Sequence, residues 1–283
     1  MSQTLWPKGC LEAVDLHKTY RLESGATRQV IGGFNLTLTP KALTALMGPS
    51  GCGKSVLINL LAGYEEPDQG AIYLDNQLIS GPGPDRLVVF QETALFPWLS
   101  VFENVAYGPK IQGLYKGAEL TKVVRDLLRL VGLDEFRDQY PAQLSGGMQR
   151  RAELARALIN HPKVALMDEP FRGLDALTRS LMRDYYLELF EKSQGCHLFV
   201  TAELDEALLL ADSLVITTNQ PAKVKKIIPV NLPRPRLETI RNSPEYLALK
   251  AESLELLHEE ALKSFKAGAL DAVDFVGAYA AVN

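Results

Sequence analysis

Residues 42–63 read ALTALMGPSGCGKSVLINLLAG and determine the fold of this chain. The apolar run 42–47, the glycine-rich loop and the second apolar run predict a strand, a loop and a helix in that order. Within this stretch, GPSGCGKS at 48–55 matches the pattern G-x-x-x-x-G-K-[ST] in the context that the pattern requires. The alternative is a chance glycine-rich turn, and the strand-loop-helix order argues against it.

The residue types of this loop suit the binding of a nucleotide phosphate. Gly48, Gly51 and Gly53 allow the backbone to curl so that its N–H groups point at phosphate oxygens. The start of the following helix adds a partial positive charge. Lys54 is expected to reach the β- and γ-phosphates, and Ser55 to offer its hydroxyl to Mg²⁺.

Four further positions complete the predicted nucleotide site, namely Pro49, Ser50, Cys52 and Val56. Many such loops carry a second hydroxyl residue where this chain has Val56, so one contact to the nucleotide is expected to be missing. Cys52 is either a redox-sensitive thiol or a tolerated small residue, and the second reading is favoured.

A pair of carboxylates follows a second apolar strand. The segment VALMDEP at 164–170 places Asp168 and Glu169 at the end of that strand, where ligands of open parallel sheets bind. Asp168 is predicted to hold the hydration shell of Mg²⁺, and Glu169 to act as general base toward the attacking water. A solvated pair that merely ends the strand is the alternative, and the phosphate loop weighs against it.

Composition excludes several classes of protein. The 283 residues are 47% apolar and 23% charged, with a net charge of −4, as in ordinary soluble proteins. There is no apolar run of about 18 residues to span a membrane and no secretion signal in residues 1–20. The acidic balance disfavours nucleic acid as a partner. The three cysteines lie far apart, so neither a disulfide framework nor a metal-ligand spacing is expected.

The chain divides into three predicted parts. Strand patterns dominate residues 1–91 and alternate with helices over 163–230, which predicts an α/β core with an antiparallel β region early in the chain. Residues 92–162 read as an inserted α-helical subdomain, and residues 231–283 as a C-terminal helical extension.

Local patterns predict individual elements. A hairpin is expected at 71–79 around Asp75 and Asn76, and a turn or a bulge at Gly32 and Gly33. Helices are expected at 176–192 and 203–211. Residues 238–266 read as one amphipathic helix whose apolar side consists of Tyr246, Leu249, Leu254, Leu257, Ala261 and Phe265. No element is predicted for residues 268–283.

The decisive motif is LSGGM at 144–148. Together with the phosphate loop, MDEP at 167–170 and Gln91, it resembles the nucleotide-binding subunit of ABC transporters over most of residues 11–230. The resemblance implies the P-loop ABC ATPase fold, with ATP and Mg²⁺ as cofactors. It also implies that Ser145, Gly146 and Gly147 contact the γ-phosphate held by a second such subunit, identical or a sister chain. A plain helix cap at Ser145 is the alternative.

Other positions carry over from the resemblance one by one. Tyr20 matches the aromatic residue that stacks on adenine, with a core tyrosine as the alternative. Gln91 matches the glutamine that senses Mg²⁺ and the attacking water. Asp175 matches the aspartate of the loop that joins the two active sites. Phe96 and Trp98 lie where a permease is expected to dock, with a local helical core as the alternative.

Three segments point to a subgroup. GPGPDR at 81–86, FPWLSVFENV at 96–105 and DEPFRGLDALTR at 168–179 are similar to the nitrate/sulfonate/taurine importer ATPases. That resemblance implies a bacterial importer of a small anion or related solute, which works with two permease subunits and a periplasmic binding protein. The subunit is then expected at the cytoplasmic face of the inner membrane.

One position departs from the family pattern. Ala202, in VTAELDEA, stands where the family places a histidine that contacts the γ-phosphate. Its loss predicts ATP binding with strongly reduced hydrolysis. His197 precedes the strand core and is read as structural. Two other functions stay open, a nonhydrolytic regulatory subunit and, disfavoured by the acidic charge, an ABC ATPase acting on DNA or ribosomes. Arg150 and Arg151 are expected to form ion pairs or dimer contacts.

Overall fold

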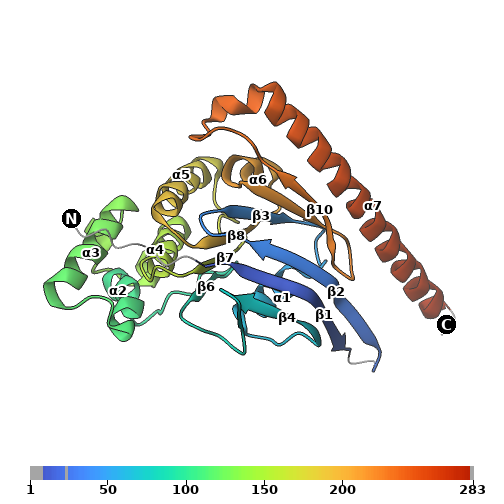
Figure 1. Ribbon diagram of the computed structural model, residues 1–283, viewed down its shortest axis with the longest axis horizontal. Helices are drawn as coiled ribbons and strands as arrows, with labels where there is room; N and C mark the ends of the chain where they lie inside the picture. Colours follow the sequence, from blue (N-terminus) through green and yellow to red (C-terminus); the bar gives the residue numbers. More distant parts are fainter. Residues whose placement is uncertain (1–8, 23–24, 281–283) are drawn as a thin grey trace.

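The computed structural model describes residues 9–22 and 25–280, with side chains placed up to Lys266. Residues 1–8 and 23–24 of the predicted core, and 281–283 of the predicted extension, lie outside the described residues. Two sheets form the body of the molecule (Figure 1). The larger has the order β10-β9-β3-β8-β7-β6, with bounds Val224–Pro229, Ser213–Thr217, Leu43–Met47, Cys196–Val200, Val164–Asp168 and Arg86–Val89.

The central strands of this sheet are parallel and buried. β8 pairs in parallel with both β3 and β7, and only the edge strand β10 runs antiparallel. All five residues of each of β3, β7 and β8 are buried, as expected for strands covered on both faces. The carboxyl ends of β3 and β7 therefore lie at one edge, separated by the width of β8. The phosphate loop and the carboxylate pair follow these two ends.

The smaller sheet is antiparallel and has the order β2-β1-β4-β5, with bounds Thr27–Leu38, Leu11–Arg21, Gln69–Leu74 and Gln77–Leu78. Asp75 and Asn76 join β4 to β5 with φ of 52° and 64°, so the predicted hairpin is confirmed. Gly33, with φ of 83°, lies inside β2, next to a register shift. Of the two predicted alternatives for Gly32 and Gly33, the structure has the bulge.

Helices cover the sheets in three groups. α1 (Lys54–Ala62) packs into a core shared with the antiparallel sheet. α2 (Val101–Gln112), α3 (Gly117–Leu130) and α4 (Gly146–Leu158) surround a separate apolar core, and the short 3₁₀ helices Asp134–Phe136 and Pro141–Gln143 lie between α3 and α4. α5 (Ala176–Lys192) and α6 (Leu204–Leu210) cover the parallel sheet together with the start of α7 (Figure 1).

The C-terminal helix differs from its prediction. Residues Glu238–Asn242 form a 3₁₀ helix, and α7 then runs from Pro244 to Ala280. The single helix predicted over 238–266 is wrong at both ends. Proline lacks an N–H and suits the first turn of a helix, so α7 starts anew at this residue.

The packed side of α7 agrees with its prediction only in part. Tyr246, Leu249 and Leu257 pack against the main core as predicted. Up to Lys266, the fully buried positions of α7 are Tyr246, Ser253 and Glu260, each seven residues after the last. Leu254 and Phe265 of the predicted apolar side are 49% and 76% exposed. Two of these buried residues are polar, so a search for an apolar stripe could not find this face. Within residues 9–22 and 25–280, no helix combines the length and apolar character that crossing a membrane requires.

Candidate nucleotide-binding site

The backbone conformation of the phosphate loop depends on its three glycines. Gly51 and Gly53 have φ of 73° and 114°, in the left-handed region that disfavours residues with a Cβ. At Gly48 the reason is space, because a Cβ there would lie 2.0 Å from Thr217 Oγ1. Lys54 Nζ donates to the carbonyls of Gly48 and Pro49 at 3.0 and 2.9 Å, so its ammonium group lies across the loop.

The first helical turn meets the end of β7. Ser55 Oγ donates to Asp168 Oδ2 at 2.9 Å. Burial raises the pKa of the Asp168 carboxyl, and the Ser55 hydrogen bond and the Lys54 ammonium oppose that effect. A hydroxyl and a carboxylate are oxygen ligands of the kind that Mg²⁺ takes beside substrate phosphates. Ser55 and Asp168 therefore fit the predicted metal site.

Glu169 lies beside this pair in a strained backbone conformation, with φ of 45°. Its carboxylate forms an ion pair with Arg172, from Oε2 to Nη1, at 3.3 Å. A cavity of about 310 Å³ opens over the loop and is lined by Ser50, Lys54, Glu169, Arg172, Arg179 and Ala202, among others. The structure thus brings the predicted general base and the predicted phosphate ligand to one cavity.

Ala202 follows β8 and lines this same cavity with a methyl group. Around it, Thr201 Oγ1 donates to Glu206 Oε2 at 2.5 Å, and Arg179 pairs with Glu203 at 3.2 Å. Arg179 Nε and Glu206 Oε1 are buried and find no hydrogen-bond partner in the described part of the chain. The cavity wall at Ala202 therefore carries two unsatisfied polar atoms.

His197 cannot replace the absent histidine, because it is fully buried inside β8. Its Nδ1 lies 2.7 Å from Tyr186 Oη, and its Nε2 lies 3.1 Å from Ser193 Oγ. Burial lowers the pKa of this imidazole to about 3. The structural reading of His197 agrees with these contacts.

The predicted second anion site occupies a different cavity, of about 720 Å³. Its lining includes Gln91, Ser145, Gly146, Gly147 and Asp175. Ser145 caps α4 by accepting a hydrogen bond from the Met148 amide at 3.3 Å, as expected for the alternative in which it is a plain helix cap. Within one chain, the structure does not bring these residues to the phosphate loop.

Asp175 stands at the start of α5 and accepts hydrogen bonds from the amide and the hydroxyl of Thr178, at 3.0 and 2.6 Å. These bonds lower the pKa of its carboxyl. Arg172 and Gly173 line both the smaller cavity and the larger one. The segment 172–175 thus connects the two sites.

An arginine that the motifs did not single out holds the Gln91 segment. Arg150, on α4, donates through Nη1 to the carbonyl of Phe90 at 2.7 Å and through Nη2 to the carbonyl of Gln91. It also pairs at 2.7 Å with Glu153, and both side chains are buried. Glu153 in turn accepts from the Ala94 amide at 3.1 Å. The expected ion pair of Arg150 is confirmed, and its two main-chain contacts are new.

Three other predicted residues, Tyr20, Cys52 and Val56, line neither cavity. The hydroxyl of Tyr20, on β1, donates to Glu65 Oε2 at 2.5 Å. Cys52 is buried, with Sγ 3.4 Å from Thr217 Oγ1, as suits a small packed residue. Val56 packs against the core around α1.

A third hollow, of about 610 Å³, lies between α2, α4 and the β6 edge. Phe96 and Tyr107 line it, and Arg156 lies over the Phe96 ring at 5.0 Å. Trp98 stacks on Phe96 at 5.6 Å between ring centroids and is 69% exposed. The stacked rings of Phe96 and Trp98, of which Trp98 is exposed, do not form a buried helical core, and they are also unusual for a polar surface.

The phosphate loop follows β3, and the carboxylate pair ends β7, the next strand but one in the same parallel sheet. This arrangement defines a P-loop nucleotide-binding protein. A family model described as ABC transporter matches residues 31–172, and this chain belongs to that family. The family match confirms the resemblance drawn from LSGGM, the phosphate loop and MDEP.

Individual relatives agree with this assignment. The taurine import ATP-binding protein TauB of Pseudomonas aeruginosa is 42% identical over 249 residues, 86% of this chain and 93% of that protein. An ABC transporter ATP-binding protein of Methanocaldococcus jannaschii is 40% identical over 90% of this chain and 94% of its own length. The bicarbonate transport ATP-binding protein CmpC of Synechococcus elongatus is 41% identical over 87% of this chain, but only 38% of that longer protein is covered.

A solved structure confirms the fold. A dimeric ATP-binding cassette in a post-hydrolysis state, bound to ADP and Pi, is 27% identical to this chain with a TM-score of 0.69. The match covers 78% of this chain and 99% of that one. The predicted α/β fold, with its antiparallel region and inserted helices, is therefore correct.

Proposed function

We propose that this chain is the ATP-hydrolysing subunit of a bacterial importer for a small anion or related solute. The observation that carries the proposal is the meeting of Ser55 with Asp168 at 2.9 Å, beside a cavity shared by Lys54 and Glu169. The cavity thus holds groups that bind phosphate and activate water, and the proposed metal ligands Ser55 and Asp168 are the neighbours of Lys54 and Glu169 in the chain.

The residues of the nucleotide site have separate roles in phosphate binding, metal binding and proton transfer. The loop N–H groups of residues 48–56, apart from Pro49, and the ammonium group of Lys54 bind the phosphates of ATP, and Tyr20 stacks on the adenine. Ser55 and Asp168 would hold Mg²⁺, which would neutralise charge on the phosphate oxygens. The family resemblance also assigns Gln91 to the metal, although in this chain Gln91 lines the other cavity. Glu169 accepts a proton from the attacking water, and its ion pair with Arg172 orients the carboxylate.

Two chains complete each ATP site. Ser145 and its two glycines line a cavity apart from the phosphate loop, so they act on nucleotide held by a second ATP-binding subunit. The helix start of α4 supplies N–H groups and a partial positive charge toward a γ-phosphate. The dimeric state of the similar cassette supports this arrangement.

The hollow around Phe96 and Trp98 is the docking site of a membrane permease. Aromatic residues gathered around an exposed hollow are typical of protein interfaces. Relatives named for taurine import and bicarbonate transport support the importer assignment, and both solutes carry an anionic group. The subunit then works at the cytoplasmic face of the inner membrane, with two permease subunits and, indirectly, a periplasmic binding protein.

Ala202 lowers the rate of hydrolysis without preventing ATP binding. A methyl group offers neither a proton nor a charge to the γ-phosphate, whereas Lys54 and the loop are intact. The second candidate function, a nonhydrolytic regulatory subunit, is favoured only by this one residue.

The deciding experiment is ATP hydrolysis by the assembled complex, with the natural chain and with Ala202→His. We expect a gain of about 10²- to 10⁴-fold with histidine. Glu169→Gln in the Ala202→His background should remove that gain, which serves as the control. Tight ATP binding with no gain would instead support the nonhydrolytic subunit, and near-normal turnover by the natural chain would contradict the role given to Ala202.

A further inference from the structure

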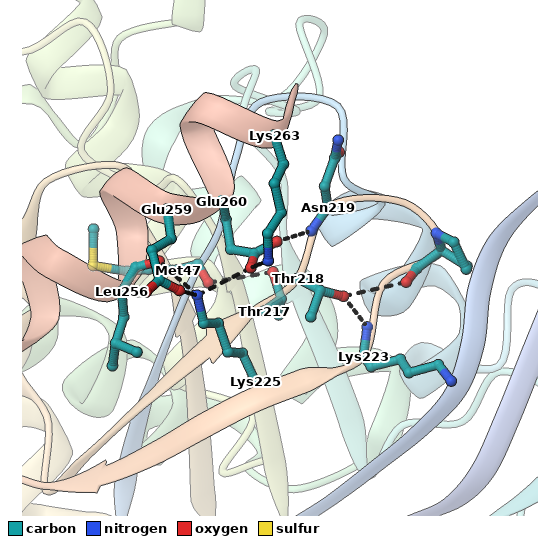
Figure 2. A network of polar contacts seen from close by, with 11 residues as sticks. Met47, Thr217, Thr218, Asn219, Lys223, Lys225, Leu256, Glu259, Glu260 and Lys263 are labelled. Atoms are coloured by element: carbon teal, nitrogen blue, oxygen red, sulfur yellow. Dashed lines mark hydrogen bonds and ion pairs between the residues drawn. The ribbon is translucent and has the colours of Figure 1, made fainter. Parts of the chain in front are cut away.

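The long helix α7 is fastened to the body of the protein by a buried carboxylate, shown in Figure 2. Glu260 is only 1% exposed, although it is charged and lies on a peripheral helix. It accepts hydrogen bonds from the Asn219 amide at 2.9 Å, from Lys225 Nζ at 3.0 Å and from Lys263 Nζ at 2.7 Å. A buried charge with several donors fixes the geometry of the groups around it.

Asn219 belongs to the loop that joins β9 to β10, and this loop supports the phosphate loop at two points. The next residue, Gln220, donates through Nε2 to the carbonyl of Gly51 at 2.6 Å. Thr217, at the end of β9, fills the space beside Gly48 and lies 3.4 Å from Cys52 Sγ. The first residue and the middle of the phosphate loop therefore rest on residues 217–220.

The orientation of Gln220 is itself fixed. Arg28 Nε donates to Gln220 Oε1 at 2.5 Å, so the amide nitrogen of Gln220 is directed toward Gly51. Glu260 fixes the main chain one residue earlier, at Asn219. Two hydrogen bonds, joined by the main chain between Asn219 and Gln220, thus connect α7 to the phosphate loop.

The neighbouring carboxylate does not share this role. Glu259 pairs with Lys225 but is 54% exposed, and within the described residues it makes no hydrogen bond to the 218–223 loop. Burial opposes ionisation of Glu260, yet the hydrogen bonds from Lys263, Asn219 and Lys225 outweigh it and lower the pKa of this carboxyl to about 2. Glu260 is therefore charged at neutral pH.

We propose that Glu260 and Gln220 are positioning residues for the nucleotide, through which α7 holds the phosphate loop in its binding conformation. Glu260 fixes the 218–223 loop, and Gln220 fixes Gly51, whose flexible backbone has no side chain to hold it. The inference rests on the proposed function in one respect, because it takes ATP to be the ligand of the phosphate loop.

The test measures the Kd for ATP, in EDTA to prevent turnover, on the full chain and three variants. Glu260→Gln keeps the shape of the side chain but removes the charge, and we expect Kd to rise about tenfold. Gln220→Met removes the donor to Gly51 and should raise Kd to a similar degree. Glu259→Gln is the matched control, because it removes a carboxylate one residue away, and its Kd should stay within about twofold of the natural value.

The double variant tests whether both residues act through one path. If they do, Glu260→Gln combined with Gln220→Met should bind ATP little worse than either single variant. Kd values for Glu260→Gln and Gln220→Met equal to that of Glu259→Gln, or effects that multiply in the double variant, would overturn the proposal. If Glu260→Gln lowers Tm strongly, Gln220→Met decides, because this partly exposed side chain lies outside the three apolar cores.

A fourth variant separates this inference from the function on which it rests. Lys54→Met removes the ammonium group from the phosphate loop and should abolish ATP binding. If the natural chain and Lys54→Met bind ATP equally, the proposed function fails and the inference fails with it. If Lys54→Met abolishes binding while Glu260→Gln and Gln220→Met leave Kd unchanged, the inference alone fails.

Discussion

The hydroxyl of Ser55 donates a hydrogen bond to Asp168 Oδ2 at 2.9 Å, across 113 residues of sequence. The contact exists because β8 alone separates β3 from β7, so the residues after these two strands meet at one edge of the sheet. A helix N-terminus and a buried carboxylate are thereby held together.

Asp168→Asn keeps the size of the side chain but removes the negative charge that a divalent cation requires. We expect ATP to bind in EDTA with a Kd within a few-fold of the natural value. The Mg²⁺-dependent rate, measured in the Ala202→His background, should fall about 10²-fold or more. Ser55→Ala, which removes a neutral ligand, should cost less than Asp168→Asn. Equal Mg²⁺ dependence of Asp168→Asn and the parent would contradict the metal role.

Gly48→Ala would place a Cβ 2.0 Å from Thr217 Oγ1 and 3.1 Å from Cys52 Sγ. Both neighbours belong to packed elements, so we expect a loss of about 1–3 kcal/mol in the free energy of unfolding and a rise in Kd for ATP above tenfold. Denaturant unfolding and equilibrium binding check the two effects. Gly146→Ala is the control for stability, because nothing lies within 4 Å of the Cβ it would add.

Arg150→Met removes one partner of a buried ion pair and leaves Glu153 charged and buried without its main partner. We expect a destabilisation of about 3–5 kcal/mol, since an uncompensated buried charge is costly. The comparison is Lys192→Met, which breaks an ion pair to Glu188 in which the two side chains are 56% and 48% exposed. That loss should stay below about 1 kcal/mol. Similar losses for the two variants would show that Arg150 is an ordinary surface cation.

Stability should fall as the pH is lowered below about 6.5, in part because of His197. Its pKa is about 3 in the folded chain, against about 6.5 when unfolded, so between these values only the unfolded state binds the proton. The free energy of unfolding therefore decreases as the pH is lowered, by at most about 1.4 kcal/mol per pH unit for one proton. Above pH 6.5, His197 does not make the free energy of unfolding depend on pH.

His197→Asn isolates this contribution from other titrating groups. The free energy of unfolding of the variant should vary less with pH between 6.5 and 4 than that of the natural chain, whatever its absolute value. Urea unfolding at a series of pH values makes the comparison. Parallel curves for the two proteins would show that His197 takes up its proton while folded.

The local parts of the site could be predicted because each is encoded in consecutive residues. The phosphate loop and the Asp168–Glu169 pair each follow an apolar strand, and their order along the chain implies a shared sheet edge. Ser145 is also recognisable from its motif, and within one chain it lines a cavity separate from that of the phosphate loop. Sequence alone indicated that separation only through the family resemblance.

The contacts that sequence reasoning missed are made by buried polar residues. Arg150 and Glu260 look like solvated charges when only apolar periodicity is counted, because both stand on helices among other charged residues. Their partners, the carbonyl of Gln91 and the amide of Asn219, are main-chain groups that no motif records. The buried Ser253 and Glu260 also explain why the predicted apolar side of α7 matches the packed side only in part.

Arg150 fastens the Gln91 segment by main-chain carbonyls alone. An anchor of this kind does not depend on which side chains occupy positions 90 and 91, so substitutions there would leave the attachment to α4 in place. The Gln91 side chain takes no part in this attachment. The position of residue 91 relative to the helical subdomain is therefore set through its main chain, separately from whatever its side chain contacts.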